Sequence, residues 1–326
     1  MRRAYILISS IALVLSACGG GSDPATSPPP PVGTMTDLVI TGANAKPAAR
    51  VAYGSTTQST ETGGLVGDTG LASTPDSGLQ KPGIERSLAS AIGRALKGVP
   101  LGPDTYDCGV AGTMTISGNL ASLFTLTAGD TINMEAEYCD DGLGEVVNGR
   151  MEFTVAVFSG DVTLGMYLLD MGVLLIDYEV ATAEDTITSN GDSLVSMDTT
   201  GNPMIFMAIS GSSMVTVSNS TTQIMTNFDT SQSVNTGVQP EPYTLSSSGT
   251  VDNSELGGII SFSTPVTFQG SGAAYPYAGE LEITGANGSR IRLIALDDVN
   301  VRIETYSSGG NTPDSTEDTT WDDIAP

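Results

Sequence analysis

The sequence lacks histidine, has a single tryptophan and is poor in basic residues. Without histidine, Ser-His-Asp and Cys-His catalysis are excluded, together with most zinc sites. The 326 residues include 12 Lys or Arg against 37 Asp or Glu, a formal net charge of -25. Four basic and 31 acidic residues follow residue 100, which gives this part a charge of -27. Such a surface repels nucleic acid and favours solubility, with cation binding as the alternative interpretation.

Long helical blocks are also scarce, and the 39 glycines separate short runs of alternating polar and apolar residues. Runs such as 131–139 and 150–158 have the period of two that is typical of strands. The pattern predicts a mainly β fold, an antiparallel sandwich or an open or closed barrel, with one N-terminal amphipathic helix. The β domain is predicted at residues 101–306. An acidic tail follows at 307–326, in which Trp321 is expected to fold back onto the sheet.

The one clear helical pattern lies at residues 82–97, within a segment, 37–100, that we expect to be partly disordered. Ile84, Leu88, Ile92 and Leu96 recur at intervals of four, and Gly98 follows as a stop signal. The apolar stripe is narrow, so this helix is expected to cover the strands. Residues 52–80 are rich in Gly, Ser and Thr, and we expect them to be poorly ordered.

Two hairpins can be placed in register from the alternation of their residues. A three-residue loop at 286–288 sets Ile283 against Ile291 and Leu281 against Leu293, and pairs Glu282 with Arg292 on the opposite face.

A second loop is predicted at 170–172, and it would make the tip of its hairpin apolar on both faces. Either the chain covers this tip or a lipid or ligand contacts it. The candidate contact residues at this tip are Leu168, Leu169, Met171, Leu174 and Leu175.

Carboxylates are plentiful, but no pair is marked as a general acid and base, so the sequence predicts no enzyme and leaves a carboxylate-based hydrolase as the residual alternative. We expect no cofactor. No segment fits the calcium loop D-x-[DN]-x-[DN]-G. The weak metal candidates are Asp140, Asp141 and Glu145, which an ordinary turn explains equally well.

The N-terminus has the order of an export signal: Arg2 and Arg3, an apolar stretch from Ala4 to Leu15, and small residues before Cys18. The apolar stretch is too short to span a bilayer. Residues 15–18, Leu-Ser-Ala-Cys, resemble the lipobox of bacterial lipoproteins. The resemblance implies a signal peptide at 1–17, removed by cleavage after Ala17, and lipid on Cys18.

Residues 18–36 are rich in Gly, Ser and Pro and are predicted to form a tether. If Cys18 carries lipid, Cys108 and Cys139 remain as an even pair in an oxidising compartment, which predicts a disulfide.

The leading functional hypothesis is a lipid-anchored envelope lipoprotein that acts without catalysis as a scaffold or binding module. The chain resembles uncharacterised bacterial lipoproteins that join a lipobox and a Gly-rich and Pro-rich spacer to a β domain. Gly19, where an aspartate would signal inner-membrane retention, favours the outer membrane on either its periplasmic or its surface face. The expected partners are the membrane, through Cys18, and an envelope protein or hydrophobic ligand. One alternative is a lipid carrier with an open barrel, and another is a calcium-dependent adhesin.

Overall fold

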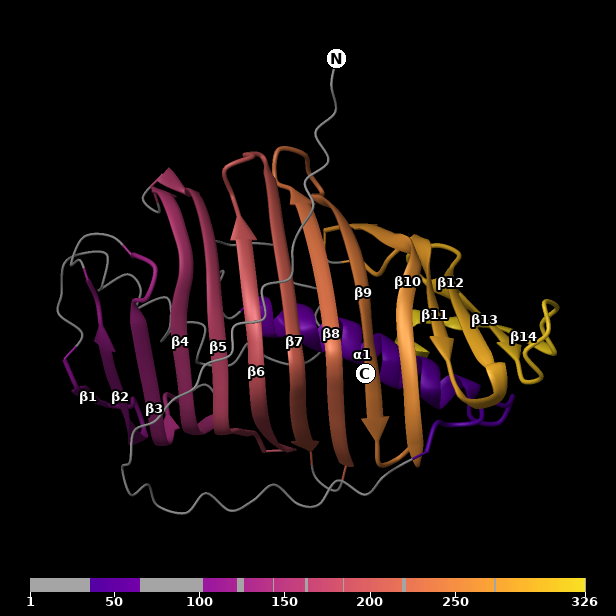
Figure 1. Ribbon diagram of the computed structural model, residues 1–326, viewed down its shortest axis with the longest axis horizontal. Coiled ribbons are helices and arrows are strands. Elements are labelled where there is room, and N and C mark those ends of the chain that lie inside the picture. The colour runs from indigo at the N-terminus through magenta and orange to yellow at the C-terminus, as the bar shows by residue number, and fades with distance from the viewer. Residues whose placement is uncertain are drawn as a thin grey trace. The chain divides into compact units, whose positions relative to one another are not determined.

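A computed structural model shows a single antiparallel sheet of 14 strands whose order in space is their order in the chain (Figure 1). The structure describes residues 36–64, 102–121, 126–142, 144–161, 164–183, 185–218, 221–272 and 274–325. The predicted helix at 82–97 and the predicted lipid site at Cys18 lie outside these ranges. The mainly β, antiparallel fold expected from the sequence is confirmed. The first and last strands do not pair with each other, so the sheet is open.

The secondary-structure elements have the following bounds. They are α1 (Ala45–Gly64), β1 (Asp104–Asp107), β2 (Ala111–Asn119), β3 (Thr131–Asp140), β4 (Val146–Asp161), β5 (Met166–Ala181), β6 (Thr186–Asp198), β7 (Met204–Ser218), β8 (Thr221–Asn235), β9 (Pro242–Asn253), β10 (Gly258–Ser271), β11 (Ala278–Thr284), the 3-10 turn η2 (Ala286–Gly288), β12 (Arg290–Ala295), β13 (Asn300–Tyr306), β14 (Ser315–Thr320) and the 3-10 turn η3 (Trp321–Asp323).

The two faces of the sheet differ in polarity because successive side chains of a strand point to opposite sides. On β12, for example, Ile291, Leu293 and Ala295 are buried, while Arg290 and Arg292 between them are partly exposed. We call the buried side the inner face and the other the outer face. The inner face is the core of the protein, and the outer face carries most of the hydroxyl and charged groups.

Helix α1 lies against the inner face and contacts β7 to β13 (Figure 1). The side that it buries is made of small residues, because Ala48, Ala49 and Ala52 are inaccessible to solvent together with Ser55 and Thr56. The two hydroxyls donate to carbonyl groups one turn back, Ser55 to Val51 at 2.7 Å and Thr56 to Ala52 at 3.1 Å. Small side chains let the helix backbone approach the large side chains of the sheet. Within the described ranges, no helix is long and apolar enough to cross a membrane.

This helix corrects the expectation that residues 52–80 are poorly ordered, at least as far as Gly64. Large apolar residues at helical spacing, which mark the helix predicted at 82–97, are few in this segment. Its helix instead depends on tertiary packing of alanine, serine and threonine, which can override weak local preference.

The N-terminal end of the described chain is hydrogen-bonded to β10 and to the turn that follows β11. The Leu38 N–H donates to the Ile259 carbonyl at 2.8 Å, and the Ala286 N–H donates to the Leu38 carbonyl at 2.8 Å. The Ile40 N–H donates to the Ser289 hydroxyl at 2.9 Å. The N-terminal end of the described chain therefore joins the sheet through three hydrogen bonds.

The C-terminal acidic segment is also part of the sheet, since β14 pairs with β13 along its whole length. Trp321 then folds back as expected and is fully buried. Its indole N–H donates to the carbonyls of Pro276 at 3.0 Å and Asp297 at 3.1 Å. Its ring lies 4.8 Å from that of Tyr53 in α1, so it joins the helix to the end of the sheet.

Two other predictions are confirmed. Cys108 and Cys139 form a disulfide with their Cα atoms 5.4 Å apart. On the chain-entropy model, closing a loop of this length stabilises the fold by about 3–4 kcal/mol. In the hairpin of β11 and β12, Ile283 pairs with Ile291 and Glu282 with Arg292, which is the predicted register.

The second predicted hairpin is wrong. Residues 170–172 do not turn, because β5 runs without interruption from Met166 to Ala181 and pairs with both β4 and β6. Asp170 and Gly172 were interpreted as a turn signal, but two neighbouring strands supply the cross-strand contacts that fix this segment as extended. The tip that was expected to be apolar on both faces is instead the middle of a long strand.

We predict that Trp321→Ala lowers the free energy of unfolding by about 3–5 kcal/mol, because it empties a buried site between α1 and the sheet. Urea denaturation followed by circular dichroism measures the change. Val266→Ala, at a half-exposed side chain on β10, is the control and should stay within about 0.5 kcal/mol of wild type. A Trp321→Ala variant as stable as this control would show that the indole does not hold the helix to the sheet.

Candidate functional site

A depression of about 580 Å³ lies over the middle of β4, β5, β6 and β7. Strand register shows how its outer-face residues are arranged. One row crosses the four strands as Thr154, Gly172, Leu194 and Ser210, and the next begins with Glu152, Leu174 and Asp192. The depression therefore has an apolar floor with hydroxyl and carboxylate groups around it.

Gly172 forms the lowest part of this floor. It lies between the buried Met171 and Val173, so a side chain at this position would point to the outer face. A Cβ atom placed there would meet only the Thr154 carbonyl oxygen, at an ordinary 3.8 Å. Neither a left-handed backbone nor a close neighbour requires glycine, although glycine in a strand costs about 0.5–1 kcal/mol relative to alanine. Such a glycine is typical of a place where a ligand or another backbone approaches.

Leu174 and Leu194 flank Gly172 and remain 38% and 42% exposed. Leu194 is directly opposite Gly172 on β6, and Leu174 follows it two residues along β5. Each leucine thus presents one side to the space that Gly172 leaves open. Together the three residues make an apolar patch in a face that is otherwise rich in Ser, Thr and Asp.

A β-bulge in β7 shapes the far side of the depression. Asp192 pairs with Ser213 and Leu194 with Ser210, so Gly211 and Ser212 together face the single residue Ser193. The Ser212 hydroxyl donates to an Asp192 carboxylate oxygen at 2.9 Å. Gly211 is required here, since a Cβ atom would lie 2.2 Å from the Phe228 ring.

The rim of the depression is acidic. Glu152 forms an ion pair with Arg150 at 2.9 Å. Asp192 is hydrogen-bonded to the neutral Ser212. Two more carboxylates stand nearby, Asp170 two residues before Gly172 on β5 and Asp229 opposite Ser210 on β8. Around the depression, the described strands therefore carry four carboxylates and one arginine.

The five residues predicted to contact a hydrophobic partner are divided between the two faces. Leu169, Met171 and Leu175 are buried on the inner face, while Leu174 lines the depression. Leu168 is on the outer face opposite Asp198 and is partly buried. The alternation of β5 explains the apolar character of both faces, and only Leu174 of the five lies at the candidate site.

The weak metal candidates do not form a site in the described part of the chain, where no group of three or more acidic or cysteine residues is arranged to hold a metal ion. Asp140 accepts a hydrogen bond from the Gly142 N–H at 2.8 Å, as in an ordinary turn. Glu145 is buried beside Tyr178. Burial, reinforced by the Glu145 charge, raises the pKa of Tyr178 far above its ordinary value, so this phenol stays protonated.

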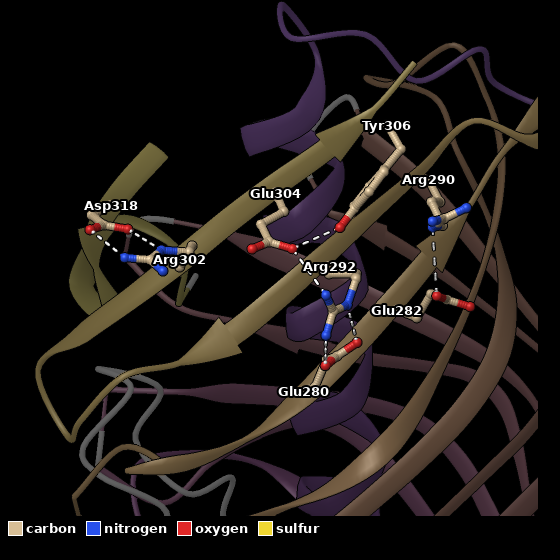
Figure 2. A network of polar contacts seen from close by, with 8 residues as sticks. All are labelled: Glu280, Glu282, Arg290, Arg292, Arg302, Glu304, Tyr306 and Asp318. Carbon is tan, nitrogen blue, oxygen red and sulfur yellow. Dashed lines mark hydrogen bonds and ion pairs between the residues drawn. The ribbon is translucent and has the colours of Figure 1, made fainter. Parts of the chain in front are cut away.

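The most extended charge network lies on the outer face of β11 to β14, away from the depression (Figure 2). Arg292 forms ion pairs with Glu280 at 2.6 Å and with Glu304 at 3.1 Å. The Tyr306 hydroxyl donates to the same Glu304 oxygen at 2.8 Å. Because these groups are occupied with one another, the network ties the three strands β11, β12 and β13 together and is a structural feature.

The same face holds the pair of Arg302 and Asp318, with two hydrogen bonds of 2.7 and 3.0 Å between β13 and β14 (Figure 2). The hydrogen bonds from Arg302 hold the pKa of Asp318 below its ordinary value of 3.8. The pair links the last strand, which is bonded on one side only, to the rest of the sheet.

Comparison of the chain with protein-family models, with curated proteins and with solved structures gives no match. The depression was not found from the sequence, because Gly172 was interpreted as part of a turn. One sequence feature could have indicated the depression: if residues 171–175 form a strand, Gly172 points to the polar face between two apolar neighbours.

We predict that Gly172→Val leaves the protein at least as stable as wild type, with a gain of up to about 1 kcal/mol, because valine favours strands and the space is open. Gly211→Val, the matched variant on β7, should lower the free energy of unfolding by about 1–3 kcal/mol through its clash with Phe228. Urea denaturation of both variants measures the difference. If Gly172→Val proves the more destabilising of the two, the floor is not open as described.

We predict a pH-dependent effect for Asp318→Asn. Because the folded-state pKa of Asp318 is lowered, its pairing stabilises the fold above the unfolded-state pKa of 3.8 and this contribution is lost as the pH falls through the folded-state pKa. The urea midpoints of wild type and variant should therefore differ at pH 6 and converge as the pH falls below 3.8 and through the folded-state pKa. Asp298→Asn removes the same charge from a neighbouring turn and is the control. A difference that is independent of pH would rule out the carboxylate as its source.

Proposed function

We propose that this protein is a lipid-anchored lipoprotein of the bacterial envelope, and that its β domain is a non-enzymatic binding module whose binding surface is the depression on β4 to β7. The observation that carries the proposal is Gly172. It is a glycine that the backbone does not require, in the middle of a strand, at the bottom of an apolar floor.

The anchor part of the proposal is supported by residues 15–18 and by the position where a tether would join the domain. Acyl chains on Cys18 would hold the protein at the membrane. A Gly-rich and Pro-rich tether would connect Cys18 to Thr36, next to the hydrogen bonds of Leu38 with Ile259 and Ala286. A pull on the tether would then be transmitted to the sheet between β10 and β11.

The absence of catalysis in the proposal follows from the histidine-free sequence and from the dispersed carboxylates around the depression. A general acid and base would need two carboxyl groups converging on one reacting atom. Here Glu152 is held by Arg150, and Asp192 is bonded to Ser212. This arrangement suits recognition of a charged or hydrogen-bonding group.

The depression favours binding at the outer face over the lipid-carrier alternative. A carrier would hold its ligand against the inner face, where the described apolar side chains are buried and α1 covers β7 to β13. The exposed apolar floor is on the opposite side. The proposed ligand therefore binds at the surface of the sheet.

Two experiments on the full-length chain in the cells that produce it test this proposal. Metabolic labelling with an alkyne-tagged palmitate should label wild type, and Cys18→Ser should abolish the label. A labelled Cys18→Ser variant would contradict the anchor.

For the binding surface, a photoreactive amino acid replaces Thr154 on the rim, or Ser231 on β8 as the control. Irradiation of intact cells should give a discrete adduct at position 154 that is absent at 231 and is lost when Gly172→Val is added. Equal adducts at both positions, or none at 154, would contradict a binding role for the depression.

A further inference from the structure

The proposed binding surface has a chemistry that selects its partner, and this inference rests on that proposed function. We infer that the depression binds an extended, cationic and amphipathic segment of a partner protein. One apolar side chain of this segment occupies the space above Gly172, and lysine or arginine side chains next to it meet the carboxylates of the rim.

The size of the floor fits one apolar side chain at a time. Neighbouring strands are about 4.8 Å apart, and residues two apart along a strand are separated by about 6.6 Å. Leu194, one strand away from Gly172, and Leu174, two residues along, therefore leave a space about as wide as a valine or leucine side chain. Both leucines are still exposed enough to be covered further.

The charge around the floor requires a cationic partner. Glu152, Asp170, Asp192 and Asp229 stand around the depression, and Arg150, the one basic residue described on β4 to β8, is already paired with Glu152. Complementary charge steers association and suppresses wrong partners. The acidic rim would repel anionic lipid head groups and nucleic acid.

The same argument opposes the described sheet of a second copy as the occupant. The basic residues in the described part of the sheet are Arg150, Arg290, Arg292 and Arg302, and each forms an ion pair with a glutamate or aspartate on its own sheet. A second copy would present the same acidic face. A partner with unpaired lysine or arginine is therefore favoured.

The partner is recognised by its side chains. The backbone groups of β5 and β6 are engaged in ladders with the strands on both sides, so this part of the sheet offers no free edge for an added strand. The hydroxyls of Thr154 and Ser210 lie in the row of Gly172 and can bond the polar groups of a segment lying across the strands. An extended segment presents alternate side chains to one surface, so an apolar residue and basic residues two positions away on either side, as in K-x-L-x-K, can all face the depression.

Fluorescence anisotropy with the full-length protein in neutral detergent micelles tests the inference. The probe is a labelled peptide of sequence KSLSK with blocked ends, compared with ESLSE and KSGSK. Wild type should bind KSLSK at least about 10-fold more tightly than either comparison peptide, since the floor and the rim are both needed. Equal binding of ESLSE, or of KSGSK, would overturn the inference.

Two variants and a control assign the binding to the depression. Gly172→Val fills the floor and should weaken KSLSK binding at least about 10-fold, while Asp192→Asn should weaken it about 2-fold to 5-fold and reduce its salt dependence. Ser231→Val, on the same face, should bind as wild type does, and it also accounts for peptide held by the micelles. Unchanged binding by Gly172→Val would overturn the inference.

Competition with hexylamine separates a protein segment from a small cation. Hexylamine that displaces KSLSK at the concentration of the peptide itself would assign the site to small alkylammonium ligands and overturn the partner segment. Failure of this inference is distinguishable from failure of the proposed function. A specific adduct at position 154 in cells, with no binding of KSLSK, leaves the binding module in place and removes only the cationic partner.

Discussion

An open sheet must bury one of its faces without the closure that a barrel provides, and the packing of α1 against the inner face meets this constraint over β7 to β13. The contact works because Ala48, Ala49 and Ala52 are small enough for the helix to lie close to the strands. Trp321 closes the same layer from the other end of the chain through its contact with Tyr53. Sequence-distant segments therefore stabilise one core.

The apolar side chains of the inner face are buried in the core, so we propose that a partner binds at the outer face. The edges of the sheet discourage other pairing, since β1 is short and carries Asp104 and Asp107, and β14 carries Glu317 and Asp318. On the outer face, the network around Arg292 is satisfied internally. The depression at Gly172 remains as the place where apolar surface, open space and unneutralised carboxylates coincide.

The sequence predicted the parts of this fold that depend on local pattern. The period of two predicted the antiparallel strands, and the loop at 286–288 predicted the register of β11 and β12. The disulfide was predicted because two cysteines remain once Cys18 is set aside. It failed where distant contacts decide the conformation. Residues 170–172 look like a turn until β4 and β6 pair with them, and α1 looks like a loop until the sheet packs on it. The depression could not be found before β5 was known to be continuous.

The central claim is that α1 is an integral part of the core and closes the inner face over β7 to β13. Native-state hydrogen exchange of the full-length protein at increasing urea concentrations tests it most directly. The amides of Ala48 to Tyr53 should exchange only through the same global unfolding as those of β8 to β11. Exchange of the α1 amides through a separate opening of lower free energy, with the strands still protected, would contradict it, because the inner face would then be accessible to a ligand.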